Sequence, residues 1–277
     1  MAAVLQQLPA FGMSLFRLCV WLVLLAAIFT PLERLFAGRP RPVLRARLGS
    51  DLVYYFLNNL LPPLILAPPL AAIGWLLHFI VPHSVYALSG SLPVWARVGL
   101  GLVLGDLAYY WGHRAMHRIP LLWRFHAVHH AAEDVDWLVS TRAHPLDIAL
   151  SHLCGLIPLY AFGLAQPLSR STDVAALLFV VIGTAWGFFI HANLNWRFGW
   201  LERLVSTPAF HHWHHTRADH VDRNFASLLP GLDLAFGTYY LPRRLPAEYG
   251  VRDPIASDMA SQLIEPFGPP RAARQAG

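Results

Sequence analysis

The sequence predicts an all-α membrane protein: a bundle of about four to five spanning helices with a histidine-rich dimetal site. Three observations support this prediction. Hydrophobic residues make up 56% of the 277 residues and charged residues only 13%, about half the charged fraction of a typical soluble domain. The apolar residues gather in runs long enough to cross a bilayer. Thirteen of the 15 histidines lie between His113 and His220, close to the ends of such runs.

Five apolar runs are the candidate spans, namely residues 11–30, 52–81, 94–111, 146–164 and 174–190. A helix needs about 20 residues to cross the hydrocarbon core. The second run is longer and contains two proline pairs, at 62–63 and 68–69, so we expect a kink or a break there. Two interpretations of this run stay open, a single crossing and a re-entrant hairpin.

Charge predicts the orientation. Five arginines follow the first run, at positions 34, 39, 41, 45 and 47, and the positive-inside rule places such a segment in the cytoplasm. If residues 52–81 cross once, every dense histidine group falls on the same cytoplasmic side. A hairpin would break that agreement for the first two groups, so we favour the single crossing. We predict an integral protein of a bacterial inner membrane, with the histidine site facing the cytoplasm.

The chain divides into three parts by composition. Residues 1–93 contain the N-terminal spans and the arginine-rich loop, residues 94–252 contain the histidine groups, and residues 253–277 are rich in proline, alanine and glycine. We expect the last part to be a poorly ordered tail. No block of basic residues lies on a soluble domain, which argues against nucleic-acid binding. Cys19 and Cys154 both lie in apolar runs, which disfavours a disulfide framework or a thiolate zinc site.

The histidines form three dense groups and one isolated element, and within a group they recur at i+3 and i+4. On a helix this spacing places side chains on one face, with Cβ atoms about 5–6 Å apart, close enough to share a metal ion. The nine candidate ligands are His113, His117, His126, His129, His130, His191, His211, His214 and His215. A tetrahedral zinc takes four ligands, so nine imidazoles indicate two metal ions. Imidazole binds zinc, iron, copper and nickel, so the ligand type leaves the metal open. Haem is disfavoured, because its ligands should lie singly within spans.

Four further residues are candidates for weaker ligands or for partners of a ligand: His144, His212, Asp106 and Asn193. Asp106 lies two helical turns before His113 and on the same face. Metal-bound imidazoles commonly donate their second N–H to such a carboxylate, and a structural hydrogen bond within the bundle is the alternative. His212 lies three residues before His215, so the helical geometry permits it to assist.

Six segments of the sequence resemble the motifs of a known protein family: GDLAYYWGHRAMH, WRFHAVHH, STRAHPLD, FIHANLNW, TPAFHHWHH and NFASLLPGLDLAFGTYY. Their order resembles that of the fatty acid hydroxylase/sterol desaturase superfamily, over about half of the chain, residues 105–242. The resemblance implies a membrane helical domain with a cytosolic cap, two non-haem iron ions held by the nine histidines, and O2-dependent hydroxylation or desaturation of a lipid C–H bond. Some members have been found with zinc in the metal positions, so zinc is a second candidate in the isolated protein. His144 fits the Arg-x-His-Pro element of the same pattern.

Such chemistry needs a lipid substrate from the bilayer and two electrons from outside. The chain has no GxGxxG fingerprint and no cysteine set for an iron–sulfur cluster, so we predict a separate donor: a ferredoxin, a cytochrome or a reductase. The substrate stays open among sterols, carotenoids, fatty acyl chains, alkylglycerol ethers and amino-lipid headgroups. The hypothesis from another class is a non-catalytic membrane metal-binding protein, such as a metal transporter or sensor. A transporter should place ligands along a path through the spans, whereas these ligands lie at one end.

Overall fold

The computed structural model describes residues 2–165, 173–253 and 255–269, and it confirms the all-α prediction. No strand forms in these ranges, where the only extended pairings are two isolated bridges, Ala37 with Leu194 and Thr216 with Tyr249. The α-helices are α1 (Ala2–Leu35), α2 (Leu48–Ile80), α3 (His83–Ser91), α4 (Val94–Arg118), α5 (Pro120–His130), α6 (Pro145–Ala161), α7 (Val174–His191), α8 (Pro208–His214), α9 (Gly231–Ala235) and α10 (Met259–Ile264). Three short 3-10 helices complete the described secondary structure: η1 (Trp137–Thr141), η2 (Gly199–Arg203) and η3 (Glu265–Phe267).

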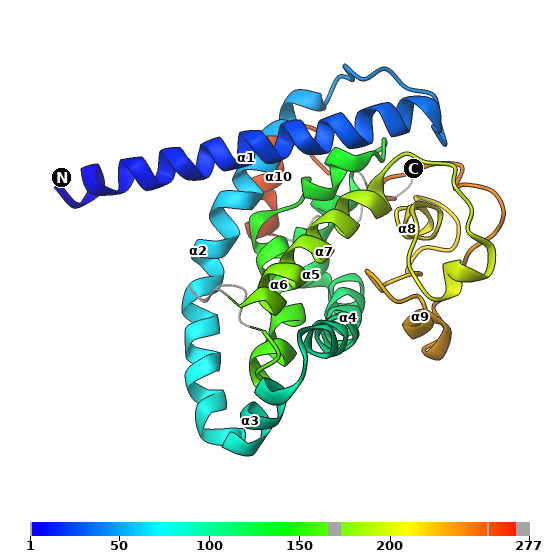
Figure 1. Cartoon of the computed structure of the whole chain (residues 1–277). Coiled ribbons are helices and arrows are strands. Elements are labelled where there is room, and N and C mark those ends of the chain that lie inside the picture. The colour runs from blue at the N-terminus through cyan, green and yellow to red at the C-terminus, as the bar shows by residue number, and fades with distance from the viewer. Residues whose placement is uncertain (1, 166–172, 254, 270–277) are drawn as a thin grey trace.

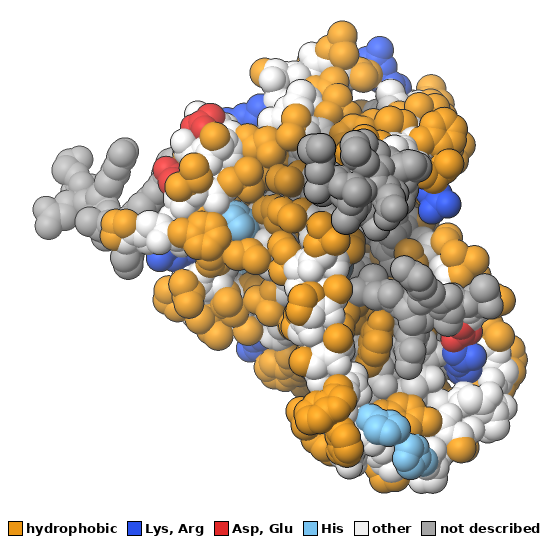
Figure 2. Space-filling view, turned by 90° about the vertical axis from the view of Figure 1, so that its left-hand side faces the viewer, with side chains coloured by type: hydrophobic (Ala, Val, Ile, Leu, Met, Phe, Trp, Pro, Cys, Tyr) orange, Lys and Arg blue, Asp and Glu red, His pale blue; other side chains and the backbone are white. Residues whose placement is uncertain are grey.

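Each predicted span corresponds to a helix, and three of these helices are long and apolar enough to cross a membrane: α1 over Phe11–Leu35, α2 and α7. Helix α6 is shorter, at 17 residues, and α4 contains several charged side chains. Hydrophobic side chains cover much of the face that lies to the left in Figure 1, as Figure 2 shows. Among them Leu64, Trp75 and Phe79 of α2 are more than 65% exposed. Such a surface is stable only against lipid, so the chain is an integral membrane protein.

Helix α2 continues through both of its proline pairs. The expected break is absent, and one helix of 33 residues extends about 50 Å at 1.5 Å per residue, while Figure 1 shows that it bends along its length. It begins beside the arginine-rich loop and ends at α3, at the opposite end of the bundle. The hairpin interpretation is therefore wrong, and the helix has the length of a single crossing.

The bundle forms because α6 packs between α2 and α4, and α7 packs on α4. Leu66 and Leu70 of α2 meet Leu156 and Leu159 of α6 in one apolar cluster. Glycine lets α4 approach α6 closely: a Cβ added at Gly112 would lie 2.5 Å from the sulfur of Cys154. The C-terminal ends of α4 and α7 both reach α5, where the ring of His113 lies 4.9 Å from that of His126 and the ring of His191 lies 5.1 Å from that of His129. The histidine groups lie in this region.

A buried ionic network joins the start of α2 to the cap. Asp51 is fully buried and accepts hydrogen bonds from the guanidinium groups of Arg45 and Arg142. Arg45 also donates to Asp136, with Nη2 2.8 Å from Oδ1. Buried charges require such pairing, because an unpaired one retains its full desolvation cost. The network therefore fixes the arginine-rich loop and Arg142 against the N-terminal end of α2.

A second contact from α2 holds the same segment of the cap. The Asn58 side chain donates from one nitrogen to the carbonyls of Thr141 and Ala143, each at 2.8 Å. These carbonyls flank Arg142, whose own carbonyl faces the histidine cluster. Side chains of a spanning helix thus determine the position of a backbone oxygen beside the site.

Part of the predicted tail is helical. Helix α10 and η3 lie within residues 253–277, and Gln262 of α10 is buried and accepts a hydrogen bond from the Tyr54 hydroxyl of α2 at 2.9 Å. Residue 254 and residues 270–277 lie outside the described residues. The three-part division of the chain stays a prediction.

Replacing the carboxylate at the centre of the ionic network tests its contribution to stability. Asp51→Asn leaves two buried guanidinium groups without their shared counter-charge. Breaking a buried ion pair costs roughly 3–5 kcal/mol, so we expect the melting temperature of the detergent-purified protein to fall by at least about 6 °C. Asp219→Asn, at an exposed carboxylate, is the matched control and should leave it unchanged. An unchanged melting temperature in Asp51→Asn would refute the role of the network.

Candidate metal centre

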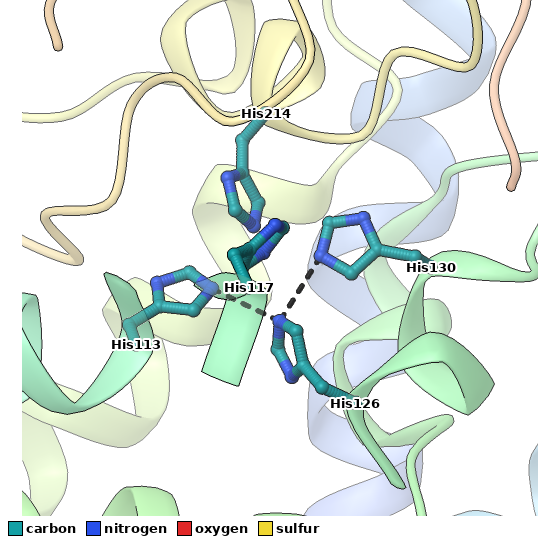
Figure 3. A group of neighbouring side chains, drawn as sticks. All are labelled: His113, His117, His126, His130 and His214. Carbon is teal, nitrogen blue, oxygen red and sulfur yellow. Dashed lines mark hydrogen bonds between the residues drawn. The ribbon is translucent and has the colours of Figure 1, made fainter. Parts of the chain in front are cut away.

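The nine predicted ligands come together in two groups. The first group is His113, His117, His126, His130 and His214, and the second group is His129, His191, His211 and His215. Within each group one nitrogen of every ring lies within 4.8 Å of the others. Figure 3 shows the rings of the first group converging from α4, α5 and α8. The structure therefore separates the nine histidines into five and four, as two neighbouring metal sites require.

Helices α5 and α8 contribute to both groups. On α5, His126 and His130 lie one turn apart in the first group, and His129 belongs to the second group. Consecutive residues on a helix point about 100° apart, so His129 and His130 face different groups. His191 enters from the C-terminal end of α7. The two groups thus share helices, and their separation is set by helical geometry.

Ring nitrogens in the first group lie at the spacing of ligands around one ion. Nε2 of His126 lies 3.1 Å from Nε2 of both His113 and His130. Nitrogens bound about 2.0–2.1 Å from a metal are about 3.0 Å apart at octahedral angles and about 3.4 Å apart at tetrahedral angles. Nε2 of His117 and of His214 are buried and have no hydrogen-bond partner among the described residues. Both are first-group ligand candidates.

For neutral rings, hydrogen bonds at the other ring nitrogens argue against the simplest alternative, which is that the short contacts are ordinary hydrogen bonds. Nδ1 of His113 lies 2.8 Å from the Phe225 carbonyl oxygen, and Nδ1 of His126 lies 3.0 Å from the Asp147 carboxylate. Each Nδ1 must donate to its oxygen, so a neutral ring keeps a lone pair on Nε2. Two lone pairs then face each other at 3.1 Å. A cation between them removes the repulsion.

The second group shows the same pattern. Nδ1 of His129 donates to the Arg142 carbonyl at 2.9 Å, and Nδ1 of His191 donates to the Gly187 carbonyl at 2.7 Å. Their Nε2 atoms lie 3.2 Å apart. Nε2 of His211 is 3.0 Å from that of His191. The described chain therefore offers two sets of converging imidazole lone pairs, each able to bind a metal ion.

Burial lowers the pKa of His113, His129 and His214. Desolvation, followed by the effect of His126, lowers the pKa of His113 to about 3 and that of His129 to about 4. The pKa of His214 is also lowered, by desolvation and by His113. These three rings are therefore neutral at neutral pH. Neutral imidazole is the form that binds metals.

Two carboxylates orient ligands of the first group, and sequence reasoning gave neither of them a role. Asp147, in the first turn of α6, accepts from His126, and Asp222 accepts from Nδ1 of His117 at 3.0 Å. Asp222 has a φ of 58°, a left-handed conformation that aspartate tolerates better than most residues. A carboxylate partner fixes the ring and raises its basicity. The position of Asp147, two residues after the Arg-x-His-Pro element, is the signal that could have indicated it.

Asp106 has a different role from the predicted contact with a ligand. Its carboxylate accepts hydrogen bonds from the backbone N–H groups of Ser227, Leu228 and Leu229, at 2.7–3.2 Å. It therefore anchors α4 to the loop that follows Phe225, the residue whose carbonyl orients His113. Asp106 thus makes structural hydrogen bonds, which was the alternative to a contact with a ligand. It affects His113 only through the loop that it anchors.

His144 lies outside both histidine groups. Its Nδ1 accepts from the Leu146 N–H and caps α6, and its Nε2 lies 3.1 Å from the Leu263 carbonyl oxygen. In this structure it joins the start of α6 to α10, so the proposed weak-ligand role is corrected to a structural one.

His212 and Asn193 also support neighbouring backbone. The ring of His212 contacts the Tyr249 hydroxyl at 2.8 Å and the His191 carbonyl oxygen at 3.3 Å. The Asn193 side chain accepts from the Arg39 N–H at 3.0 Å and donates to the Arg39 carbonyl at 2.7 Å. Neither belongs to a histidine group, and both hold the chain that follows α7.

A cavity of about 180 Å³ opens beside the first group. His117, His130 and His214 line it, and Trp123 forms an aromatic wall whose ring centroid lies 5.0 Å from that of His117. No second-group histidine is among the described residues that line this cavity. The first group is therefore accessible from it.

Metal analysis of alanine variants tests the two-group assignment. We expect two metal ions per chain in the wild type and about one in His211→Ala, because that variant loses a converging lone pair of the second group. His212→Ala is the matched neighbour and should keep both ions. The measurement is metal-to-protein ratio by inductively coupled plasma mass spectrometry. Equal losses in the two variants would rule out the assignment.

The pH dependence of the metal-free protein tests the burial of the rings. Burial lowers the pKa of His129 and of His212 to about 4, whereas an unfolded histidine titrates near 6.5. Between these values the unfolded chain binds protons that the folded chain does not, so folding stability falls as the pH falls from about 6.5 to 4. We expect a lower melting temperature at pH 5 than at pH 7 after chelation. Equal melting temperatures at pH 5 and pH 7 would show that the rings of His129 and His212 are hydrated in the folded protein.

Comparison with known proteins finds relatives that are named as hydroxylases and monooxygenases. An ornithine lipid hydroxylase, OlsE, of Rhizobium tropici is 33% identical over 179 residues, 63% of this chain and 51% of that protein. Alkylglycerol monooxygenase of Homo sapiens is 30% identical over 175 residues, 62% of this chain and 36% of that protein. Methylsterol monooxygenase 2-2 of Arabidopsis thaliana is 28% identical over 200 residues, 70% of this chain and 68% of that protein. The chain thus spans about half of the rhizobial relative and about a third of the human one. No solved structure matches it.

The model of one family, described as fatty acid hydroxylase, matches residues 98–238. This segment is half of the chain and contains all nine histidines of the two groups. It also contains Asp147 and Asp222, which orient two of those histidines. The chain belongs to the fatty acid hydroxylase family.

Proposed function

We propose that the protein is a membrane-bound, non-haem di-iron oxygenase that hydroxylates a lipid C–H bond, with desaturation as a variant of the same chemistry. The observation that carries this proposal is the convergence of imidazole lone pairs in two adjacent groups. The relatives, which are named as a lipid hydroxylase and two monooxygenases, support the type of reaction.

The first group would hold one iron ion and the second group the other, each through neutral imidazole nitrogens. Iron would supply the redox chemistry that cleaves the O–O bond of dioxygen. Zinc has no accessible change of oxidation state and would not supply it. The balanced reaction is R–H + O2 + 2 electrons + 2 H⁺ giving R–OH + H2O. Zinc bound in the isolated protein would occupy the same nitrogens and leave it inactive.

The side chains of the protein position the ligands and exclude water. Asp147 and Asp222 hold His126 and His117 in the orientation that presents Nε2. All four rings of the second group are buried, which limits solvent access to that group. The lipid would come from the bilayer, and the electrons from a separate ferredoxin, cytochrome or reductase. The arginine-rich loop supports a location in a bacterial inner membrane with the site on the cytoplasmic side.

A metal transporter or sensor is the alternative function. A transporter requires ionisable ligands along a path through the spans. Both histidine groups lie instead at one end of the bundle, where α4 and α7 end. This placement favours catalysis at the membrane surface.

Isotope labelling in cells tests the proposal. Cells that express the wild-type protein under ¹⁸O2 should contain a lipid with one labelled oxygen atom, whereas His129→Ala and His214→Ala, one from each group, should contain none. His220→Ala, at an exposed histidine outside both groups, is the control and should match the wild type. Lipid mass spectrometry is the readout. Unchanged lipids combined with reduced metal uptake in the two variants would support the transporter instead.

A further inference from the structure

The cavity beside the first group has charges of both signs along its lining. Arg217 and Arg252 contribute guanidinium groups, and Asp222 and Asp253 contribute carboxylates. Within the described part of the chain, none of the four pairs with another of the four. The lining thus brings two cationic and two anionic groups to a space that also touches three histidines of the first group.

These charged groups are held near the cavity by backbone contacts. Thr216 pairs with Tyr249 in an isolated bridge, and the Arg217 N–H donates to the Glu248 carbonyl at 3.0 Å. Arg252 donates from Nη2 to the Ala218 carbonyl at 2.5 Å. The two chain segments that line the cavity are therefore joined to each other.

Each charged group retains capacity to bind a ligand. The nearest carboxylate to Arg217 is that of Glu248, at 3.9 Å, and both side chains are well exposed, so this pair is weak. Asp222 uses one carboxylate oxygen on His117. Asp253 is exposed. A ligand that carries both signs of charge would satisfy this lining, whereas an acyl chain would remove water from four charges without compensation.

Only the C-terminal end of α4 contributes to this cavity from the five predicted spans. Its described lining includes no residue of α1, α2, α6 or α7 and comes from the ends of α4 and α5, from α8, and from residues 216–222 and 250–253. Lipid tails lie beside the spans. The atoms nearest to the first histidine group would therefore belong to the polar part of a lipid.

We propose that this cavity binds a zwitterionic lipid headgroup, with its carboxylate on Arg217 and Arg252 and its ammonium on Asp222 and Asp253. The oxidised C–H bond then lies in the headgroup or directly beside it, and the acyl chains remain in the bilayer. The reaction is the hydroxylation balanced above, so this inference rests on the proposed function. It selects an amino-acid lipid from the substrates that the sequence left open.

Binding to three matched lipids tests the site independently of turnover. The probes are an N-acyl amino-acid lipid with a free carboxylate and a side-chain ammonium, its methyl ester, and its N-acetylated form. Each is titrated calorimetrically into the full-length protein in detergent micelles. Loss of one charge-assisted contact should weaken binding about tenfold, so the zwitterion should bind about tenfold more tightly than either derivative.

Variants assign each charge to its side chain. Arg217→Gln combined with Arg252→Gln should weaken binding of the zwitterion about tenfold and leave the methyl ester unaffected. In Asp253→Asn the affinity for the zwitterion should fall toward the affinity for its N-acetylated form, because one carboxylate partner of the ammonium is lost. Arg243→Gln, at an exposed arginine outside the cavity, is the control. Each variant should retain two metal ions per chain, which shows that the fold and the histidine groups are intact.

Locating the oxygen in the product by tandem mass spectrometry separates the two proposals. A labelled oxygen in the headgroup region supports both. A label within an acyl chain, or equal affinity for the three lipids, would overturn the headgroup site and leave the oxygenase proposal standing. Headgroup-selective binding without oxygen incorporation into any lipid would overturn the oxygenase proposal and leave the binding site standing.

Discussion

The structure depends on one electrostatic constraint: imidazole lone pairs that face one another across about 3 Å in a buried space. In the first group this occurs between His113 and His126, and in the second between His129 and His191. In each pair both Nδ1 atoms donate to an oxygen, so neither Nε2 of the neutral rings carries a proton. Folding the metal-free chain therefore brings repelling groups together, and a cation in each group converts this repulsion into attraction. Metal binding and folding are coupled in this way.

Much of the surrounding structure holds those oxygens in place. The Arg142 carbonyl that orients His129 is fixed by Asp51 and Asn58 of α2, through the Arg142 side chain and the carbonyls on either side of it. The Phe225 carbonyl that orients His113 lies just before the loop anchored by Asp106. Buried polar side chains on the bundle helices thus position backbone atoms in the cap. The membrane helices and the metal site form one connected hydrogen-bonding system.

The sequence brought the nine candidate ligands to notice because their pattern is local. Spacings of three and four residues place histidines on one helix face whatever the tertiary structure, and the nine candidates lie in the two groups. Asp147 and Asp222 escaped prediction because they bond to histidines 21 and 105 residues away. Asp106 was assigned to the correct helix face, but three backbone N–H groups of a distant loop reach its carboxylate. Local spacing contains no information about such loops.

The helices show the same division between local and tertiary information. Each of the five apolar runs in the sequence coincides with a helix of the structure. Three of these helices are long and apolar enough to cross a membrane. The proline pairs predicted a kink or a break in α2, and the helix bends without breaking, because neighbouring helices can satisfy the backbone groups that proline frees. The grouping of nine histidines into five and four also follows from the crossing of helices. Residue spacing determines the helix face on which each histidine lies, but not which helices meet at that face.

Anomalous X-ray scattering at the iron edge tests the dinuclear arrangement most directly, on crystals of the protein produced in iron-supplemented medium. Two peaks per chain are expected, one enclosed by the five rings of the first group and one by the four rings of the second group. A single peak shared by both groups, or peaks outside them, would contradict the two-ion arrangement.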